Sequence, residues 1–361
     1  MIITRTPYRI SFLGGGTDYP GWFRHHGGAV IATSIDKYCY LTCRYLPPFF
    51  EHRYRIVYSR TESCARAEDI QHPAVREGLK FLGITQGIEL HHDGDLPARS
   101  GMGSSSSFAV GFMQILHALQ NGMASKDQLA KEAINLEQNI LKENVGSQDQ
   151  ISAAYGGFNH ITFLPNDEFV VRPIILGRDR MAGFQSHFML FFTGINRTAS
   201  DVASSFVPNI EDKKRQLRVL RELVEEGMAM LSSGGDLAGF GELMHEAWLA
   251  KKSLSDLISN GEVDRVYDCA RAAGALGGKL IGAGGGGFLL LYVPPAKHDD
   301  VRQSLPGLIH VPFQFESEGS RILFYDLDQD YAETAARREN QAVSSFREWQ
   351  KAPAGNPEKK S

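Results

Sequence analysis

Cysteine is scarce in this chain, and long apolar runs are missing. The 361 residues contain four cysteines, with no C-x-x-C pair among them. This argues against a disulfide-rich secreted fold, and we expect four buried thiols in a reducing cytoplasm. The apolar run 288–293 is far too short to span a bilayer, and residues 1–5 do not resemble a secretory signal. These absences together predict a cytoplasmic protein.

An excess of positive charge is also absent. The chain has 38 Lys and Arg against 42 Asp and Glu, a formal net charge of -4, which argues against a general binder of nucleic acid or of membrane surfaces. Its 42% hydrophobic and 22% charged residues are typical of globular proteins, and its length allows two domains. A binding site for an anion must therefore be local, built from backbone amides and a few cations.

The stretch 96–119 has the features of such a site. Gly101 and Gly103 flank Met102, so the backbone can bend tightly and approach a ligand closely. Four serines follow at 104–107, and then apolar residues at spacings of three and four predict a helix with one buried face. An open helix N-terminus behind a glycine bend binds anions, most often phosphate. The alternative, a serine-capped helix after a turn, needs one serine rather than four.

This stretch is not a P-loop, because no lysine follows its second glycine. Residues 97–106 read P-A-R-S-G-M-G-S-S-S, which resembles the motif P-x-x-x-G-[LM]-G-S-S-[SA] of the GHMP kinases. These are small-molecule kinases named for galactose, homoserine, mevalonate and phosphomevalonate. The resemblance implies that the anion is ATP. The residues implied in ATP binding are Pro97, Ser100, Gly101, Met102, Gly103, Ser104, Ser105, Ser106 and Ser107.

A second glycine-rich turn follows the first predicted strand, residues 2–13, which we expect to break at Pro7. Residues 14–19 read G-G-G-T-D-Y, and by themselves they are equally consistent with a turn whose aspartate caps the next element. The segment 5–19 resembles the first GHMP motif in its sugar-kinase form, which implies that Arg9 lies near the reacting groups. Galactokinases carry Glu-His at positions 15 and 16, so galactose is not the expected acceptor and a larger sugar has room. The substrate-binding residues implied here are Gly15, Gly16, Thr17 and Asp18.

Two acidic residues stand twelve positions apart in the next part of the chain. Residues 125–128, S-K-D-Q, form a capping box that opens a helix expected to reach Ile140. Glu137 borders the apolar face of that helix, so it is either a partly buried surface residue or a ligand. Residues 146–151, G-S-Q-D-Q-I, resemble the [GS]-x-x-D-Q segment of the galactokinase-like branch. This implies Asp149 as the catalytic base, kept ionised by Arg9, and Ser105 with Glu137 as magnesium ligands.

The second half of the chain predicts a buried strand at 187–193, a polar loop at 194–200 and three helices, with Gly277–Gly278 as one helix stop. Residues 282–287 match G-x-G-x-x-G. However, they precede a strand and follow a predicted helix, which is the reverse of the order in a dinucleotide-binding fingerprint. The segment 278–288 instead resembles the third GHMP motif, which implies that Gly284 and Gly285 contact the substrate.

The three motifs occur in order over residues 2 to about 345. They imply an α+β, two-domain GHMP-kinase fold with the active site in the cleft between the domains. We expect an ATP-binding N-terminal domain at 1–182, a C-terminal domain at 183–345 and a disordered tail at 351–361.

The implied activity is that of a sugar kinase that uses ATP and Mg²⁺. The first motif, the loop 193–200 and the segment 248–254 most resemble bacterial kinases of D-glycero-D-manno-heptose 7-phosphate, which phosphorylate its anomeric hydroxyl. Arg197 then either binds the distal phosphate or is an ordinary surface arginine. L-fucokinases are the alternative, and Glu137 and Asp149 argue against a nonenzymatic nucleotide-binding regulator. The expected partners are a sugar phosphate and ATP, with no nucleic acid and no membrane, and a homodimer is left open.

Overall fold

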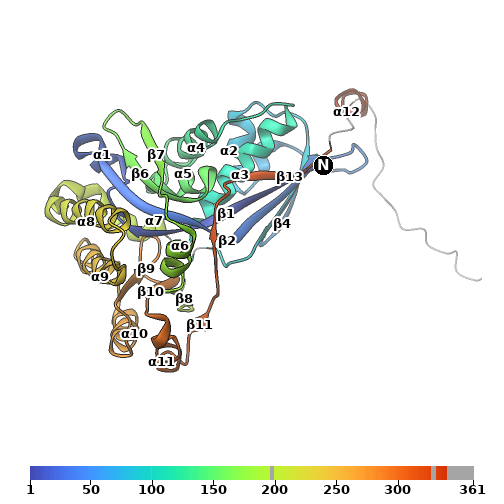
Figure 1. Cartoon of the computed structure of the whole chain (residues 1–361). Helices are drawn as coiled ribbons and strands as arrows, with labels where there is room; N and C mark the ends of the chain where they lie inside the picture. The colour runs from blue at the N-terminus through green and yellow to red at the C-terminus, as the bar shows by residue number, and fades with distance from the viewer. Residues whose placement is uncertain (99, 196–198, 327–330, 340–361) are drawn as a thin grey trace, which may run out of the picture.

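The computed structural model describes residues 1–98, 100–195, 199–326 and 331–339. Its described strands form two sheets, one of nine strands and one of four, and helices pack against both (Figure 1). None of the helices in these ranges combines the length and the apolar character that a membrane span requires. The mixture of helices and largely antiparallel sheets confirms the expected α+β class.

The first sheet is built around two long strands, β1 (Ile2–Leu13) and β2 (Gly28–Tyr45), which pair antiparallel along most of their length. The pairing order is β13-β1-β2-β5-β3-β4, and β12, β6 and β7 extend the sheet beside β2. The other strands of this sheet are β3 (Tyr54–Val57), β4 (Thr61–Cys64), β5 (Ile88–Gly94), β6 (Phe158–Phe163), β7 (Phe169–Pro173), β12 (Phe315–Glu316) and β13 (Arg321–Tyr325).

Helices cover one face of this sheet (Figure 1). They are α2 (Pro73–Phe81), α3 (Ser104–Leu119), α4 (Lys126–Ile134) and α5 (Gln148–Tyr155). The helix predicted after Gly103 is confirmed as α3, which packs on β1 and β2 with Phe112, Ile115 and Leu116 fully buried. The N-terminus of α3 is thereby fixed beside the middle of β1, where Ser107 Oγ donates to the Pro7 carbonyl and the Arg9 amide donates to the Met102 carbonyl.

The second sheet is antiparallel with the order β11-β8-β10-β9. Its strands are β8 (Phe188–Phe192), β9 (Gly277–Leu280), β10 (Phe288–Tyr292) and β11 (Ile309–His310). The predicted helices of the second half are confirmed as α8 (Lys214–Ser232), α9 (Ala238–Lys252) and α10 (Gly261–Ala272), and α11 (His298–Ser304) follows β10. Because α8 contacts both β1 and β2 while α9 packs on β9, this helical layer joins the two sheets.

Short helices complete the described fold. They are α1 (Pro20–His26), α6 (Arg178–Gln185), α7 (Ala199–Ser204), α12 (Ala332–Glu339), the 3₁₀ turns η1 (Ala67–Asp69), η3 (Val207–Lys213) and η4 (Pro295–Lys297), and the π-helical turn η2 (Asn135–Ile140). The expectation of one continuous α-helix through residue 140 is wrong from Asn135, where the Leu141 amide donates to the Leu136 carbonyl in an i to i−5 bond.

Two further expectations, a break of the first strand at Pro7 and a helix stop at Gly277–Gly278, are also wrong. β1 does not break at Pro7 but continues through it with a bulge between Pro7 and Tyr8. In the described sheet β13 pairs with β1 only as far as Arg5, so proline is tolerated beyond that point. Gly277 and Gly278 do not end a helix but begin β9, where a Cβ atom on either would overlap the backbone of Gly241 or Leu290. The glycines 282–287 therefore connect two strands.

The end of the chain returns to the first sheet. β12 pairs with β2 and β13 pairs with β1, although the sequence interpretation placed residues 183–345 in a single second domain. The division into 1–182 and 183–345 stays a prediction. The strands β12 and β13 belong by sequence to the second of these segments but pair with strands of the first. The predicted tail 351–361 and Arg197 lie outside the described residues.

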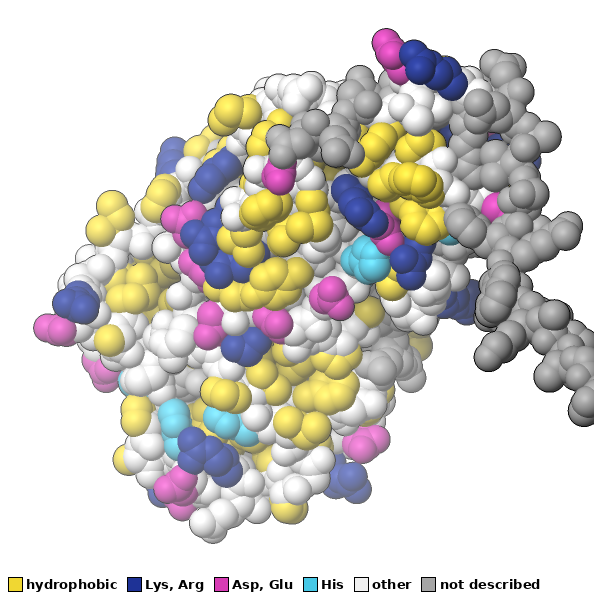
Figure 2. Space-filling model, turned by 90° about the vertical axis from the view of Figure 1, so that its right-hand side faces the viewer, with side chains coloured by type: hydrophobic (Ala, Val, Ile, Leu, Met, Phe, Trp, Pro, Cys, Tyr) yellow, Lys and Arg dark blue, Asp and Glu magenta, His cyan; other side chains and the backbone are white. Residues whose placement is uncertain are grey.

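The side of the molecule that contains β13 carries exposed apolar side chains, among them Leu323, Phe324 and Tyr325. Figure 2 shows this side, with hydrophobic patches lying between charged groups. The expectation of four buried thiols is wrong at two positions, because Cys64 is only half-buried and Cys269 on α10 is exposed. Cys39 and Cys43 are buried.

Candidate active site

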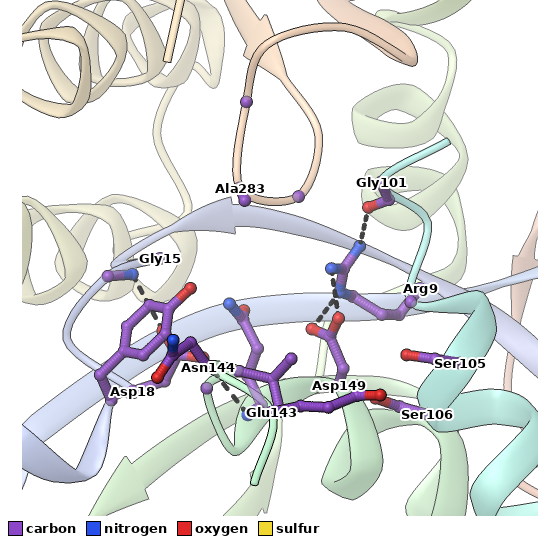
Figure 3. A pocket seen from close by; sticks show the side chains of 18 of the residues that line it. Arg9, Gly15, Asp18, Gly101, Ser105, Ser106, Glu143, Asn144, Asp149 and Ala283 are labelled. Carbon is purple, nitrogen blue, oxygen red and sulfur yellow. Dashed lines mark hydrogen bonds and ion pairs between the residues drawn. The ribbon is translucent and has the colours of Figure 1, made fainter. Parts of the chain in front are cut away.

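A cavity of about 350 Å³ lies where the elements of the two sheets meet. The first sheet and its helices supply β1, the turn after it and the N-termini of α3 and α5. The second half of the chain supplies the end of α9 and the glycine loop between β9 and β10. Figure 3 shows that the loop at Ala283 lies across the cavity from Asp149. Residues far apart in sequence therefore form a single site.

The N-terminus of α3 opens into this cavity. Gly103, in the left-handed region at φ +74°, is the N-cap, and no side chain caps the helix. Ser104, Ser105 and Ser106 line the cavity, so the free N–H groups of the first turn are available to an anion. Gly101 has φ +83°, and a Cβ atom there would overlap the Ile281 carbonyl. This glycine bend is consequently packed against the second sheet and fits a phosphate group.

Arg9 and Asp149 meet beside this bend. The Arg9 Nε and Nη2 atoms donate to the two Asp149 carboxylate oxygens, each at 2.6 Å, and Nη1 donates to the Gly101 carbonyl at 2.9 Å (Figure 3). The Arg9 side chain is 3% exposed and that of Asp149 23% exposed. A bidentate pair of this kind fixes the carboxylate in one orientation. Each Asp149 oxygen keeps a further lone pair, with which it can accept a proton from a ligand in the cavity.

Glu137, in the π-helical turn η2, is 2% exposed. Its Oε2 accepts hydrogen bonds from Ser106 Oγ at 2.7 Å and from Gln150 Nε2 at 2.6 Å. Its Oε1 has no partner among the described residues, and burial raises the pKa of Glu137 to about 7. A divalent cation would stabilise the charged carboxylate, so the unpartnered oxygen beside Ser105 and Ser106 fits Mg²⁺, which prefers oxygen ligands.

Asp18 lies at the other end of the cavity. Its Oδ1 accepts from the Gly16 amide at 2.9 Å, its Oδ2 accepts weakly from the Gln148 amide at 3.4 Å, and burial raises its pKa. Gly146 packs directly on Asp18, because a Cβ atom at that position would overlap the carboxylate. The arrangement presents a buried carboxyl group to a ligand that enters between Gly15, Gly16 and the glycine loop of the second sheet.

Comparison with known proteins identifies the family. The models for the GHMP kinases N terminal domain and the GHMP kinases C terminal domain match residues 69–157 and 219–307. The chain belongs to the GHMP kinase family. GHMP kinases use ATP, which agrees with the open N-terminus of α3. The α+β GHMP-kinase fold inferred from the motifs is thereby confirmed.

Several proteins resemble this GHMP kinase along most of its length. D-glycero-alpha-D-manno-heptose 7-phosphate kinase of Campylobacter jejuni is 27% identical over 88% of this chain and 97% of its own length. Galactokinase of Pyrococcus furiosus is 24% identical over 82% of this chain and 90% of its own. The bifunctional fucokinase/GDP-fucose pyrophosphorylase of Arabidopsis thaliana is 26% identical over 83% of this chain, which spans only 30% of that protein.

Among solved structures, the D-glycero-D-manno-heptose 1-phosphate kinase from Bacteroides thetaiotaomicron superimposes with a TM-score of 0.74 at 22% identity. The match covers 90% of this chain and 99% of that one. At this identity the likeness supports the fold alone.

Not every residue implied by the GHMP motifs reaches the cavity. Arg9, Gly15, Gly16, Asp18, Gly101, Gly103, Ser104, Ser105, Ser106, Asp149 and Gly284 line it. Pro97, Ser100, Met102, Thr17, Ser107, Glu137 and Gly285 do not, and Arg197 lies outside the described residues.

Internal contacts account for several of these residues. Thr17 Oγ1 donates to the carbonyls of Gly14 and Ala29, Ser107 Oγ donates to the Pro7 carbonyl, and Ser100 Oγ to that of Pro97. The Gly285 amide donates to the Ile258 carbonyl. These residues support the turns that carry the site, and their direct binding roles stay predictions.

The motif analysis missed other cavity-lining residues. They include Tyr19, Glu143, Asn144, Gln148, Phe206, Lys251 and Leu254. A signal for Lys251 existed in the sequence, since it lies three positions after Trp248 and four after Ala247, both buried on α9. A lysine on the buried face of a helix is unusual unless it faces a site. The loop residues of this set carry no such periodic signal.

Proposed function

We propose that this GHMP kinase transfers a phosphoryl group from ATP to the anomeric hydroxyl of D-glycero-D-manno-heptose 7-phosphate, giving the 1,7-bisphosphate. The observation that carries the chemistry is the ion pair of Arg9 with Asp149, placed directly against the glycine bend. A Cβ atom on Gly103 would lie 3.2 Å from Asp149 Oδ2. A base beside an anion cradle suits phosphoryl transfer, which depends on positioning and charge stabilisation.

Each group of residues has a distinct role in this proposal. The N–H groups at the start of α3 hold the phosphates of ATP, and Asp149 accepts the proton of the attacking hydroxyl. An anomeric hydroxyl is more acidic than an ordinary alcohol, so a carboxylate is a sufficient base. Ser105 and Glu137 hold Mg²⁺, which when bound neutralises part of the triphosphate charge.

The acceptor is inferred from the relatives and from the turn after β1. The Campylobacter relative is named for heptose 7-phosphate, and glycines at positions 15 and 16 leave space beside Asp18. L-fucokinase activity is the alternative, because the Arabidopsis and Bacteroides fragilis relatives are named for fucose. We retain the sequence prediction of a cytoplasmic location, and we leave the homodimer open as before.

A coupled ADP-release assay over a sugar panel tests the acceptor. The panel contains heptose 7-phosphate, the unphosphorylated heptose, L-fucose and galactose. A charge-assisted contact to a phosphate contributes about 1.5–3 kcal/mol, so we expect kcat/KM for the heptose phosphate to exceed that for the heptose by roughly 10- to 100-fold. Equal or better turnover of L-fucose would contradict the heptose assignment. Tight ATP binding without turnover of any sugar would favour a nonenzymatic regulator.

Replacing Glu137 with Gln tests the magnesium ligand. The amide keeps the shape of the side chain but removes the negative charge, so we expect a higher apparent Mg²⁺ requirement that excess metal partly overcomes. Turnover is measured against Mg²⁺ concentration, with Glu132→Gln as the control because Glu132 pairs with His117 on α3, away from the cavity lining. An unchanged Mg²⁺ curve for Glu137→Gln would remove Glu137 from the site.

A further inference from the structure

Lys251 is a buried cation that the proposed chemistry leaves unused. It lies in the last turn of α9, lines the cavity and is 6% exposed. Its Nζ donates to the Gly282 carbonyl in the glycine loop. Burial lowers the pKa of Lys251 to about 8, while the nearby carboxylates of Asp18 and Asp149 act in the opposite direction. Lys251 thus lies near both Asp18, where the acceptor is proposed to bind, and the proposed base Asp149.

The charges of the cavity differ in how they are compensated. Arg9 and Lys251 are the cationic side chains among its described lining residues. The charge of Arg9 is matched by Asp149, and three of its N–H groups are engaged by Asp149 and the Gly101 carbonyl. The hydrogen bond of Lys251 goes to a neutral carbonyl instead. Its positive charge is therefore available to an anionic group in the cavity.

The position of Lys251 is better suited to bind the transferred phosphoryl group than a distant part of the acceptor. Gly282 packs on the glycine bend, since a Cβ atom on it would lie 2.6 Å from the Gly101 Cα. Lys251 donates a hydrogen bond to the Gly282 carbonyl and Arg9 donates one to the Gly101 carbonyl. Both cations therefore flank the contact between Gly282 and Gly101. Phosphates held at the start of α3 would end beside it.

A second buried lysine, Lys279, lies close to the cavity but does not line it. Lys279 on β9 is 3% exposed, and its Nζ donates to the Phe12 carbonyl at 3.4 Å. It lies behind Gly15, where an added Cβ atom would be 3.8 Å from the Lys279 Nζ. Burial, together with the charges of Lys251 and Arg9, lowers the pKa of Lys279 well below its usual range, while Asp18 acts in the opposite direction. Lys251 and Arg9 are therefore the cations that act on the cavity, and Lys279 supports the turn at Gly15 from behind.

We propose that Lys251 is a catalytic residue that binds the oxygens of the phosphoryl group as it passes from ATP to the acceptor. This inference rests on the proposed phosphoryl transfer but on no particular sugar. The acceptor oxygen forms its bond to the γ-phosphorus, the bond to the bridging oxygen breaks, and its electron pair stays on ADP. The acceptor proton goes to Asp149. Lys251 keeps its protons and stabilises the charge on the transferred group.

The test compares Lys251→Met with Lys252→Met. Lys252 is the matched control, because it follows directly on α9 but pairs with Asp264 at 2.9 Å, away from the cavity lining. Loss of one group that stabilises transition-state charge costs about 10² to 10³ in kcat. We expect that loss for Lys251→Met, with the acceptor KM changed less than about threefold, and near wild-type kinetics for Lys252→Met.

A binding measurement separates catalysis from a structural role. Calorimetry with ADP, aluminium fluoride, Mg²⁺ and acceptor reports the affinity for a mimic of the transferred group, and ADP with Mg²⁺ is the reference. We expect Lys251→Met to weaken the first complex by about 100-fold and to leave the second unchanged. An equal loss in both complexes, together with a lower unfolding temperature, would show that Lys251 merely holds the Gly282 loop.

The remaining outcomes also decide the question. Retained kcat in Lys251→Met would overturn the proposal. So would a rise in KM confined to a phosphorylated acceptor, because Lys251 would then bind the phosphate of the substrate. Wild-type turnover over the sugar panel tests the proposed function separately. If the wild type phosphorylates none of the sugars, the two variants are compared with ADP, aluminium fluoride and Mg²⁺ alone, and equal affinities for this mixture would overturn the proposal.

The pH profile supplies an independent readout. Asp18, Asp149, Arg9 and Lys279 are the charged groups that surround Lys251. Since its pKa is about 8, the ammonium is lost as the pH rises through that value, and wild-type kcat/KM should decline above it. Lys251→Arg keeps a charge at high pH, so its residual activity should not show this decline. The same decline in Lys251→Arg would assign it to another group and count against Lys251.

Discussion

Replacement of Asp149 by Asn is expected to lower turnover by about 10² to 10⁴, the usual contribution of a general base. Asn keeps the shape of the side chain but accepts no proton from the attacking hydroxyl. Sugar binding should change little, because Asp18 and the glycine turn at the other end of the cavity are untouched. Steady-state kinetics at saturating Mg²⁺ measure the effect, since a lost transition-state role appears in kcat rather than KM.

The ion pair requires a control in this experiment. Arg9 is 3% exposed, so removing its carboxylate partner leaves a buried charge without compensation and lowers stability as well. The double variant Arg9→Met with Asp149→Asn separates the two roles. If Asp149 is the base, Asp149→Asn still lowers turnover in the Arg9→Met background. If Asp149 only orients Arg9, the second substitution has no further effect there. Near wild-type turnover of the single variant would also refute the mechanism.

Replacement of Gly103 by Val is expected to raise the dissociation constant of ATP by roughly 10- to 100-fold. Gly103 is at φ +74°, where a β-branched residue is strained by about 1–3 kcal/mol. Its Cβ atom would also lie 3.2 Å from Asp149 Oδ2 and 3.4 Å from Arg9 Cγ. The bend must then move, and the first N–H groups of α3 move with it. Fluorescence or calorimetric titration with ATP measures the change.

Gly83→Val is the matched control for the glycine bend. Gly83 has a similar φ of +67°, but a Cβ atom there meets no described atom within 4 Å. Both variants therefore carry the backbone strain, while only Gly103→Val disturbs the site. We expect Gly83→Val to lose thermal stability and to bind ATP normally. Unchanged ATP affinity in folded Gly103→Val would place the triphosphate elsewhere.

Local patterns determined much of this protein from sequence. The glycine bend, the serine run and the apolar periodicity after it predicted α3 and an anion site at its start, because helix formation and the exposure of its first N–H groups are decided within a few residues. The helix start predicted at Ser125 is present, with Ser125 Oγ accepting from the Gln128 backbone amide, although the Gln128 side-chain amide donates to Glu132. The order of the three motifs sufficed to identify the GHMP kinase family and its fold.

Only the tertiary structure decided which of these residues converge. Arg9 and Asp149 are 140 positions apart, yet their side chains pair at 2.6 Å. Thr17 was expected to bind the substrate, but its hydroxyl donates hydrogen bonds to a carbonyl of its own turn and to a carbonyl of β2. Of the adjacent pair Lys251 and Lys252, one faces the cavity and the other Asp264. Short-range sequence preferences set the elements, whereas the direction of a side chain depends on strand pairing and helix packing between distant segments.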